Sequence, residues 1–154
     1  MSSKGFGKEV KSPKGGLEKY IVKESGGKAK SPDWYRKQVF EYLYKNVTDE
    51  VIPGKMYFFE YDPLLKDKLP RYDTYPLVYA VDRGKDNFLG HNLHYVRDKI
   101  RPALAKSVLN KVARFPEETI HRYIFKHADN FFFEVKSEDW EFISSLPLEK
   151  FITN

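Results

Sequence analysis

The spacing of apolar residues changes along the chain, and each spacing predicts a different element. Between residues 31 and 46, apolar side chains recur every three or four positions, which places them on one face of a helix: Tyr35, Val39, Tyr42 and Leu43. The segment begins with Ser-Pro-Asp. The serine suits a helix cap, the proline suits the first turn, and the acid faces the positive end of the helix dipole. We therefore expect a helix here.

From Lys55 onward the spacing shortens to two, which is the repeat of a strand. The two faces of this strand carry Tyr57, Phe59 and Tyr61 on one side and Met56, Phe58 and Glu60 on the other. Two further strands are expected over residues 77–82 and 88–95, joined by a turn of hairpin length, and Gly90 permits a bend in the last one. Three successive strands predict an antiparallel β-meander or a bent, barrel-like small sheet.

Helical spacing returns after the sheet. Apolar residues four apart predict one helix over residues 100–112 and another over residues 116–127. Residues 131–135 are typical of a fourth strand, and a short last helix is expected after Ser137. The predicted fold class is α+β, with a small antiparallel sheet from the middle of the chain flanked by helices.

The net charge of the protein lies in its first thirty residues. Residues 1–30 hold eight lysines and three glutamates, whereas the remaining 124 residues hold 19 basic and 19 acidic side chains. Glycine pairs at positions 15–16 and 26–27 interrupt this segment. We therefore expect an extended basic arm over residues 1–30 and a single globular domain over residues 31–154.

We expect the arm to bind partners. Its central residues Tyr20, Ile21 and Val22 favour a strand that adds to the sheet edge of a neighbouring subunit. The arm contains no arginine, the residue preferred for base-specific contacts, so we expect only weak, non-specific contact with DNA. The expected partner-binding residues are Lys4, Lys8, Lys11, Lys14, Lys19, Tyr20, Ile21, Val22 and Lys23.

Few patterns in the sequence predict chemistry. There is no cysteine, no apolar run of the roughly 18 residues that a membrane helix needs, and no glycine-rich phosphate loop or nucleotide motif. His91 and His94 point to opposite faces of a strand, and His121 and His127 to different faces of a helix, so we expect no metal site and no cofactor.

One pattern is compatible with a nuclease. Glu134-Val135-Lys136 has the spacing of a metal ligand and a base in restriction-type nucleases, and Asp82 is a candidate for the further acid. Charged strand ends give this spacing easily, so we expect no catalytic residues. The dense aromatic residues can stack on bases, but packing in the core of a small sheet explains them more simply.

Three motifs occur in order along the chain: MYFFEYDP at residues 56–63, LPRYDTYPLV at residues 69–78 and FLGHNLHYV at residues 88–96. Together they resemble a family of small virion proteins of large contractile-tailed bacteriophages. The likeness extends over roughly residues 31–151. The chain departs from the family pattern at Arg71, where the pattern has tyrosine, and at His91, where an aliphatic residue is usual.

The resemblance implies a part of a phage particle. We expect a non-enzymatic virion structural protein, a tail, baseplate or neck component, that is assembled in the host cytoplasm and binds other virion proteins through its arm. The alternative is a DNA-end-binding or nuclease-type protein that acts in genome packaging.

Overall fold

A six-stranded antiparallel sheet forms the centre of the computed structural model, which describes residues 15–154. Its strand order is β1-β7-β2-β4-β5-β6. The strands are β1 (Val47–Thr48), β2 (Met56–Phe58), β4 (Leu77–Arg83), β5 (Asn87–Asn92), β6 (Ile120–Ile124) and β7 (Phe132–Val135). A separate two-stranded sheet pairs β3 (Arg71–Asp73) with β8 (Phe151–Thr153).

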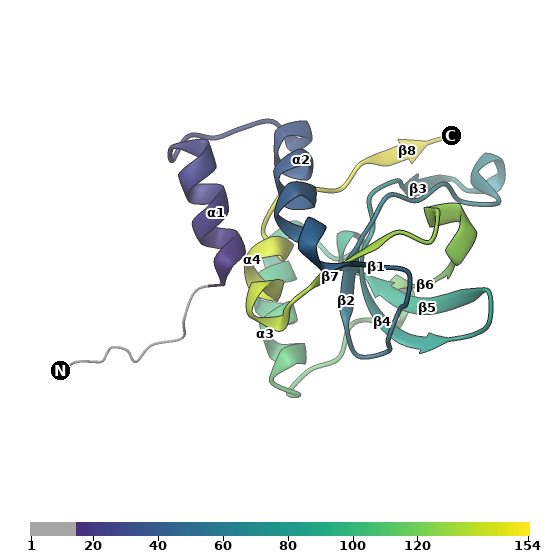
Figure 1. Ribbon diagram of the computed structural model, residues 1–154. Helices are drawn as coiled ribbons and strands as arrows, with labels where there is room; N and C mark the ends of the chain where they lie inside the picture. Colours follow the sequence, from purple (N-terminus) through teal and green to yellow (C-terminus); the bar gives the residue numbers. More distant parts are fainter. Residues whose placement is uncertain (1–14) are drawn as a thin grey trace.

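Four α-helices gather on one side of the sheet (Figure 1). They are α1 (Gly16–Ser25), α2 (Pro32–Leu43), α3 (Arg101–Leu109) and α4 (Trp140–Ser144). None of the helices described is long and apolar enough to cross a membrane. The arrangement confirms the α+β prediction.

The predicted meander is present as the neighbouring strands β2, β4 and β5. Gly90 lies where two strands approach closely: a Cβ at this position would come within 2.2 Å of the Val78 side chain and 2.8 Å of the Tyr79 carbonyl oxygen. A side chain at position 90 would therefore force β4 and β5 apart.

The side chains of the first predicted strand alternate between two hydrophobic cores, one on each face of the sheet. Met56 and Phe58 are buried against the helices, in a core that also contains Leu43 and Ile143. Tyr57, Phe59 and Tyr61 belong to a second core, which is lined by strands and short turns. The aromatic residues of the first motif thus pack both faces of the sheet.

The second core requires a strongly bent sheet. Strands β5 and β7 are separated by β2 and β4, so in a flat sheet they would lie about 14 Å apart. Nevertheless the ring centroids of Phe88 in β5 and Phe132 in β7 are 5.8 Å apart. The sheet therefore curls around its own aromatic side chains.

Helix α2 begins as predicted, with the Ser31 hydroxyl accepting a hydrogen bond from the Trp34 backbone N–H at 3.1 Å. A short 3-10 turn, Tyr44–Asn46, extends it. The expected last helix is also present as α4, in which Trp140 and Ile143 are buried. Strand β7 confirms the fourth predicted strand.

We predicted an extended conformation for the arm, and for its described part this prediction is wrong. Residues 16–25 form helix α1, so the strand expected at Tyr20, Ile21 and Val22 does not exist. Leu17 and Ile21, four residues apart, are buried in the core shared with α2 and α4. The buried carboxyl of Asp139 accepts a hydrogen bond from the Leu17 backbone N–H at 3.2 Å and holds the first turn of the helix. Residues 1–14 lie outside the described part.

The prediction of a helix over residues 116–127 is also wrong. Residues 117–119 form a 3-10 turn, and Ile120–Ile124 form strand β6, which pairs along β5 from His91↔Ile120 to Asn87↔Ile124. Without β6, strand β5 would end the sheet with unpaired backbone groups. Pairing with β5 therefore makes this segment a strand, although its apolar residues have the spacing of a helix.

Candidate nucleic-acid interface

Positive charge is concentrated around α3. Residues 97–115 hold six basic side chains and one acidic side chain, whereas the other described residues hold 17 basic and 20 acidic ones. The predicted domain has a formal net charge of zero, but its basic side chains are concentrated in one segment. A count over short windows of the sequence would have found this segment.

One of these cations is structural. Arg101 is 5% exposed and donates to the carbonyl oxygens of Val96 and His94 and to both carboxyl oxygens of Glu149. The other five are exposed and make no ion pair with another described residue. We call these five the basic end: Arg97, Lys99, Lys106, Lys111 and Arg114.

The basic end spans the length of α3, which lies at the lower end of the helical layer in Figure 1. Nine residues of helix are about 14 Å long. This length is comparable with the width of the DNA major groove, roughly 12 Å, which separates the two phosphate backbones. Cations at both ends of α3 can therefore contact phosphates of two strands.

A groove of about 660 Å³ lies beside the C-terminal end of α3. Lys111 and Arg114 line it together with apolar side chains, of which Val112 is 76% exposed and Ile120 36% exposed. The cations of such a surface can bind phosphates. The apolar area beside them can bind a flat aromatic group.

His91 lines the same groove. The Thr119 hydroxyl donates to the Pro116 carbonyl oxygen and so accepts from Nδ1–H of His91 at 2.9 Å. Burial lowers the pKa of His91 below its usual 6.5, more than its hydrogen bonding and the nearby Glu117 raise it. The ring is therefore neutral at neutral pH and adds hydrogen-bonding capacity to the groove without charge.

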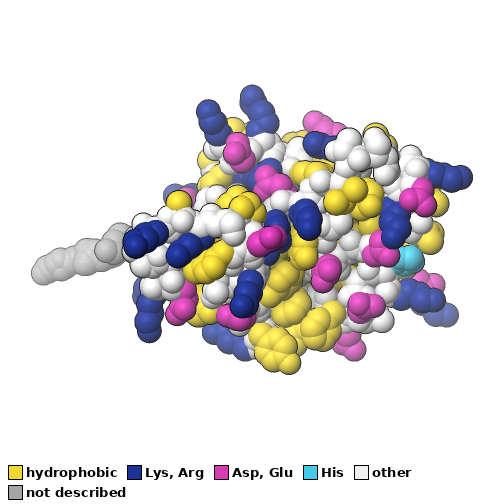
Figure 2. Space-filling view, turned by 90° about the horizontal axis from the view of Figure 1, so that it is seen from above, with side chains coloured by type: hydrophobic (Ala, Val, Ile, Leu, Met, Phe, Trp, Pro, Cys, Tyr) yellow, Lys and Arg dark blue, Asp and Glu magenta, His cyan; other side chains and the backbone are white. Residues whose placement is uncertain are grey.

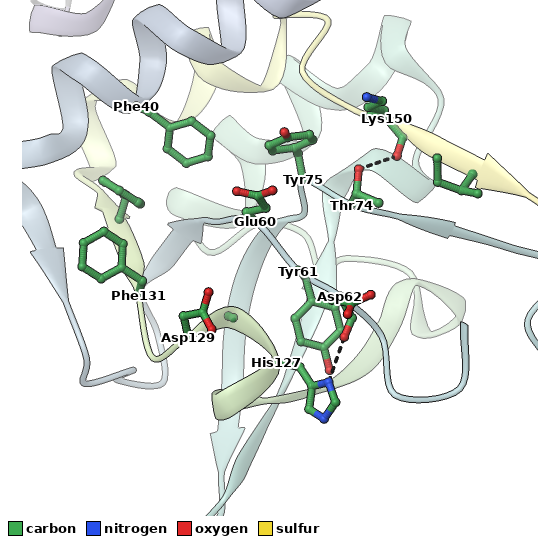
Figure 3. Close-up of a pocket in the computed structure, with 13 residues that line it drawn as sticks. Phe40, Glu60, Tyr61, Asp62, Thr74, Tyr75, His127, Asp129, Phe131 and Lys150 are labelled. Carbon is green, nitrogen blue, oxygen red and sulfur yellow. Dashed lines mark hydrogen bonds between the residues drawn. The ribbon is translucent and has the colours of Figure 1, made fainter. Parts of the chain in front are cut away.

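Another hollow of similar size has a different character. A hollow of about 650 Å³ is bordered by the carboxyl groups of Glu60, Asp62 and Asp129, and Figure 3 shows them around it with Phe40 and Phe131. Lys150 also lines this hollow, but three carboxylates against one lysine make it unfavourable for phosphate. On the face shown in Figure 2, basic and acidic side chains are interspersed around an apolar patch, so that face is not selectively basic.

The second and third sequence motifs meet at a buried carboxylate, that of Asp73. Asp73 is 4% exposed and accepts four hydrogen bonds, from the backbone N–H groups of Tyr75 and Lys150 and from the side chains of Asn92 and His94. Burial raises the pKa of Asp73, but the hydrogen bonds and the His94 ring outweigh burial and hold the pKa below its usual value. Asp73 therefore ties the second motif to the third and to the C-terminal segment.

The structure places the expected partner-binding residues as follows. Lys4, Lys8, Lys11 and Lys14 lie outside the described residues. In α1, Lys19, Val22 and Lys23 are exposed, Tyr20 donates a hydrogen bond to Gln38, and Ile21 is buried in the core. Ile21 therefore has no free surface for a partner.

The histidines are dispersed. His94 is paired with Asp73, His91 with Thr119, and His121 and His127 donate from Nδ1 to the carbonyl oxygens of Thr119 and Asp62. Within residues 15–154, no three side chains of the metal-ligating types His, Asp and Glu are grouped to hold an ion.

Asp82 is separated from the other two residues of the nuclease pattern. The Glu134 carboxyl pairs with Lys55 at 3.4 Å and with Lys136 at 3.6 Å. Asp82 lies two strands away and four residues out of register, on the order of 15 Å from Glu134. The structure does not bring the proposed acids together.

Comparison with known proteins gives one family. A family model described as "Phage T4 terminal DNA protecting protein" matches residues 10–117, a range that contains α1, α2, the three motifs, α3 and the whole basic end. No curated protein and no solved structure matches the chain.

Proposed function

The chain belongs to the phage T4 terminal DNA protecting protein family, and from this premise we propose that it binds the ends of double-stranded phage DNA and shields them from degradation. The match over residues 10–117 carries this proposal. It supports the DNA-end-binding alternative of the sequence analysis over the tail component expected first.

The basic end supplies the electrostatic part of the proposed binding. Its five exposed cations make no ion pair with other described residues, so they can exchange counterions for phosphates. Contacts of this kind are independent of base sequence. A protein that protects DNA ends of any sequence needs such contacts.

The groove supplies selectivity for an end. Inside a duplex each base pair is stacked between two others, and only a terminal base pair exposes its flat face. The apolar surface near Val112 and Ile120 can cover that face while Lys111 and Arg114 contact the adjacent phosphates. A continuous duplex offers the cations its phosphates but offers the apolar surface nothing to cover.

We also propose that protection comes from binding alone, without catalysis. A bound protein denies an exonuclease access to the terminal nucleotide, and this requires no reaction. The protein would act on DNA ends in the virion and in the host cytoplasm during assembly.

A binding competition tests the proposal. A DNA hairpin with one open blunt end should bind more tightly than a dumbbell of equal length closed by loops at both ends. The triple variant Lys106→Gln/Lys111→Gln/Arg114→Gln should weaken binding to the hairpin. It should also reduce the slope of log affinity against log salt concentration by about 2–3, because each lost phosphate contact removes about 0.9.

The matched control removes the same charge elsewhere. Lys28→Gln/Lys30→Gln/Lys37→Gln alters three exposed lysines before and within α2. This variant should bind the hairpin and the dumbbell with nearly the same affinities as the wild-type protein. Equal affinity of the wild-type protein for hairpin and dumbbell would contradict end binding. Equal effects of the two triple variants would contradict the placement of the interface.

A further inference from the structure

The three sequence motifs line one pocket of about 360 Å³. The first motif contributes Tyr61 and Pro63, the second contributes Leu69, Arg71, Tyr72 and Asp73, and the third contributes Asn92 and Tyr95. The remaining lining residues come from β6 and from the loop after the first motif. We call this space the motif pocket. Its volume lies in the range of small-molecule sites, roughly 300–1,000 Å³.

The wall of the motif pocket is aromatic and its rim is apolar. The rings of Tyr95 and His121 are stacked with centroids 4.4 Å apart. At the rim, Leu64 is 61% exposed and Leu65 57% exposed, although both lie beside a hollow that a ligand could fill. A flat, weakly polar group is the kind of ligand that such a lining accommodates.

The polar groups of the pocket suit an anion attached to that flat group. The Arg71 guanidinium lies over the rings of Phe151 and Tyr95, at 4.3 and 5.4 Å from their centroids, and makes no hydrogen bond or ion pair with another described residue. Arg122 uses one N–H on Asn87. Both side chains retain donors for phosphate oxygens.

Asp73, the one carboxylate among the described residues of the lining, does not oppose phosphate binding. All four of the hydrogen bonds that Asp73 accepts come from the protein, and the residue is 4% exposed. His121 donates Nδ1–H to the Thr119 carbonyl oxygen at 2.8 Å, which leaves its other ring nitrogen, Nε2, for contact with a base.

We propose that the motif pocket binds a single unpaired nucleotide at the end of the DNA, with its base against the aromatic wall and its phosphate on Arg71 and Arg122. This rests on the proposed function and adds to it a preference for duplex ends with an overhanging or frayed nucleotide. Edge strand β6 contributes Ile120 to the groove and the next residue, His121, to the motif pocket. Consecutive side chains of a strand point to opposite faces, so the two sites lie on either side of this edge strand.

Three DNA hairpins test the proposal: one with a blunt end, one with a single-nucleotide 3′ overhang and one with a single-nucleotide 5′ overhang. One of the overhang forms should bind about tenfold more tightly than the blunt form, as expected for one base stacked on aromatic side chains. Arg71→Gln should abolish this advantage, so that overhanging and blunt ends bind the variant with the same affinity. Leu65→Asp, at an exposed position, should do the same by placing negative charge at the rim.

The matched control is Arg83→Gln. Arg83 is also exposed and lies over an aromatic ring, that of Phe125 at 5.0 Å, but it does not line the motif pocket. Its replacement should preserve the overhang advantage. Equal wild-type affinity for blunt and overhanging ends, or an advantage that survives Arg71→Gln, would overturn the proposal.

A closed dumbbell separates the two possible failures. If open ends of every kind bind more tightly than the dumbbell but overhangs give no advantage, only the nucleotide site is refuted. If the dumbbell binds as tightly as the open hairpins, the proposed end binding fails as well.

Discussion

Asp73 shows how a single residue holds together parts of the chain that are distant in sequence. Its two carboxyl oxygens satisfy donors from residues 75, 92, 94 and 150. The contact with the Tyr75 N–H at 3.0 Å is the local turn that an aspartate commonly makes with the backbone two residues on. The partners at 92, 94 and 150 could not be predicted, because they depend on how β5 and the C-terminal segment pack.

Replacing Asp73 with asparagine should destabilise the protein by roughly 2–4 kcal/mol, because the amide NH₂ must face a buried donor. Urea unfolding at pH 7 measures this loss. Asp82→Asn is the control: Asp82 is exposed and its side chain accepts from the Arg83 N–H, so its replacement should change stability by about 0.5 kcal/mol or less.

The pH dependence gives a second check on Asp73. Because its pKa is lowered in the folded protein, its contribution to stability is present above the usual value of 3.8 and is lost as the pH falls through the lower folded value. The stability gap between wild type and Asp73→Asn should therefore narrow as the pH drops below about 4. A gap that stays constant down to the pH of acid unfolding would refute the ionised state.

Helix α1 shows what a local pattern leaves out at the scale of an element. Gly26, in the left-handed conformation with φ 62°, ends the helix, and Leu17 and Ile21 have helical spacing, so the sequence did contain a helix signal. The group that holds its first turn, Asp139, is 122 residues away. The prediction of an extended arm, based on its glycine pairs, missed this long-range cap. By contrast, α2 was predicted because its cap, Ser31, adjoins the helix.

If α1 is part of the core, Leu17→Ala should reduce the free energy of unfolding by about 2–5 kcal/mol, the usual loss for a fully buried leucine. Val22→Ala in the same helix is the control, because Val22 is 54% exposed and its loss should have little effect. Thermal or urea unfolding distinguishes them. Two equally small effects would show that α1 is not held against the rest of the protein.

At the scale of the whole molecule, charge and apolar surface are arranged in a way that total composition conceals. The formal net charge of +5 gave no indication that α3 is surrounded by five exposed cations that make no ion pair with other described residues. The local charge count was readable from the sequence. The groove was not, since it forms only when the segment after α3 packs beside β4 and β6. The proposed interface depends on both features.

Protection of DNA from an exonuclease tests the central claim most directly. Linear duplex DNA is incubated with saturating protein and a processive exonuclease, and the intact fraction is followed over time, with an endonuclease that cuts an internal site as the control. We predict that the protein blocks the exonuclease and leaves the internal cut unaffected, and that Lys106→Gln/Lys111→Gln/Arg114→Gln loses the block. Degradation at the same rate with and without saturating protein would contradict the account.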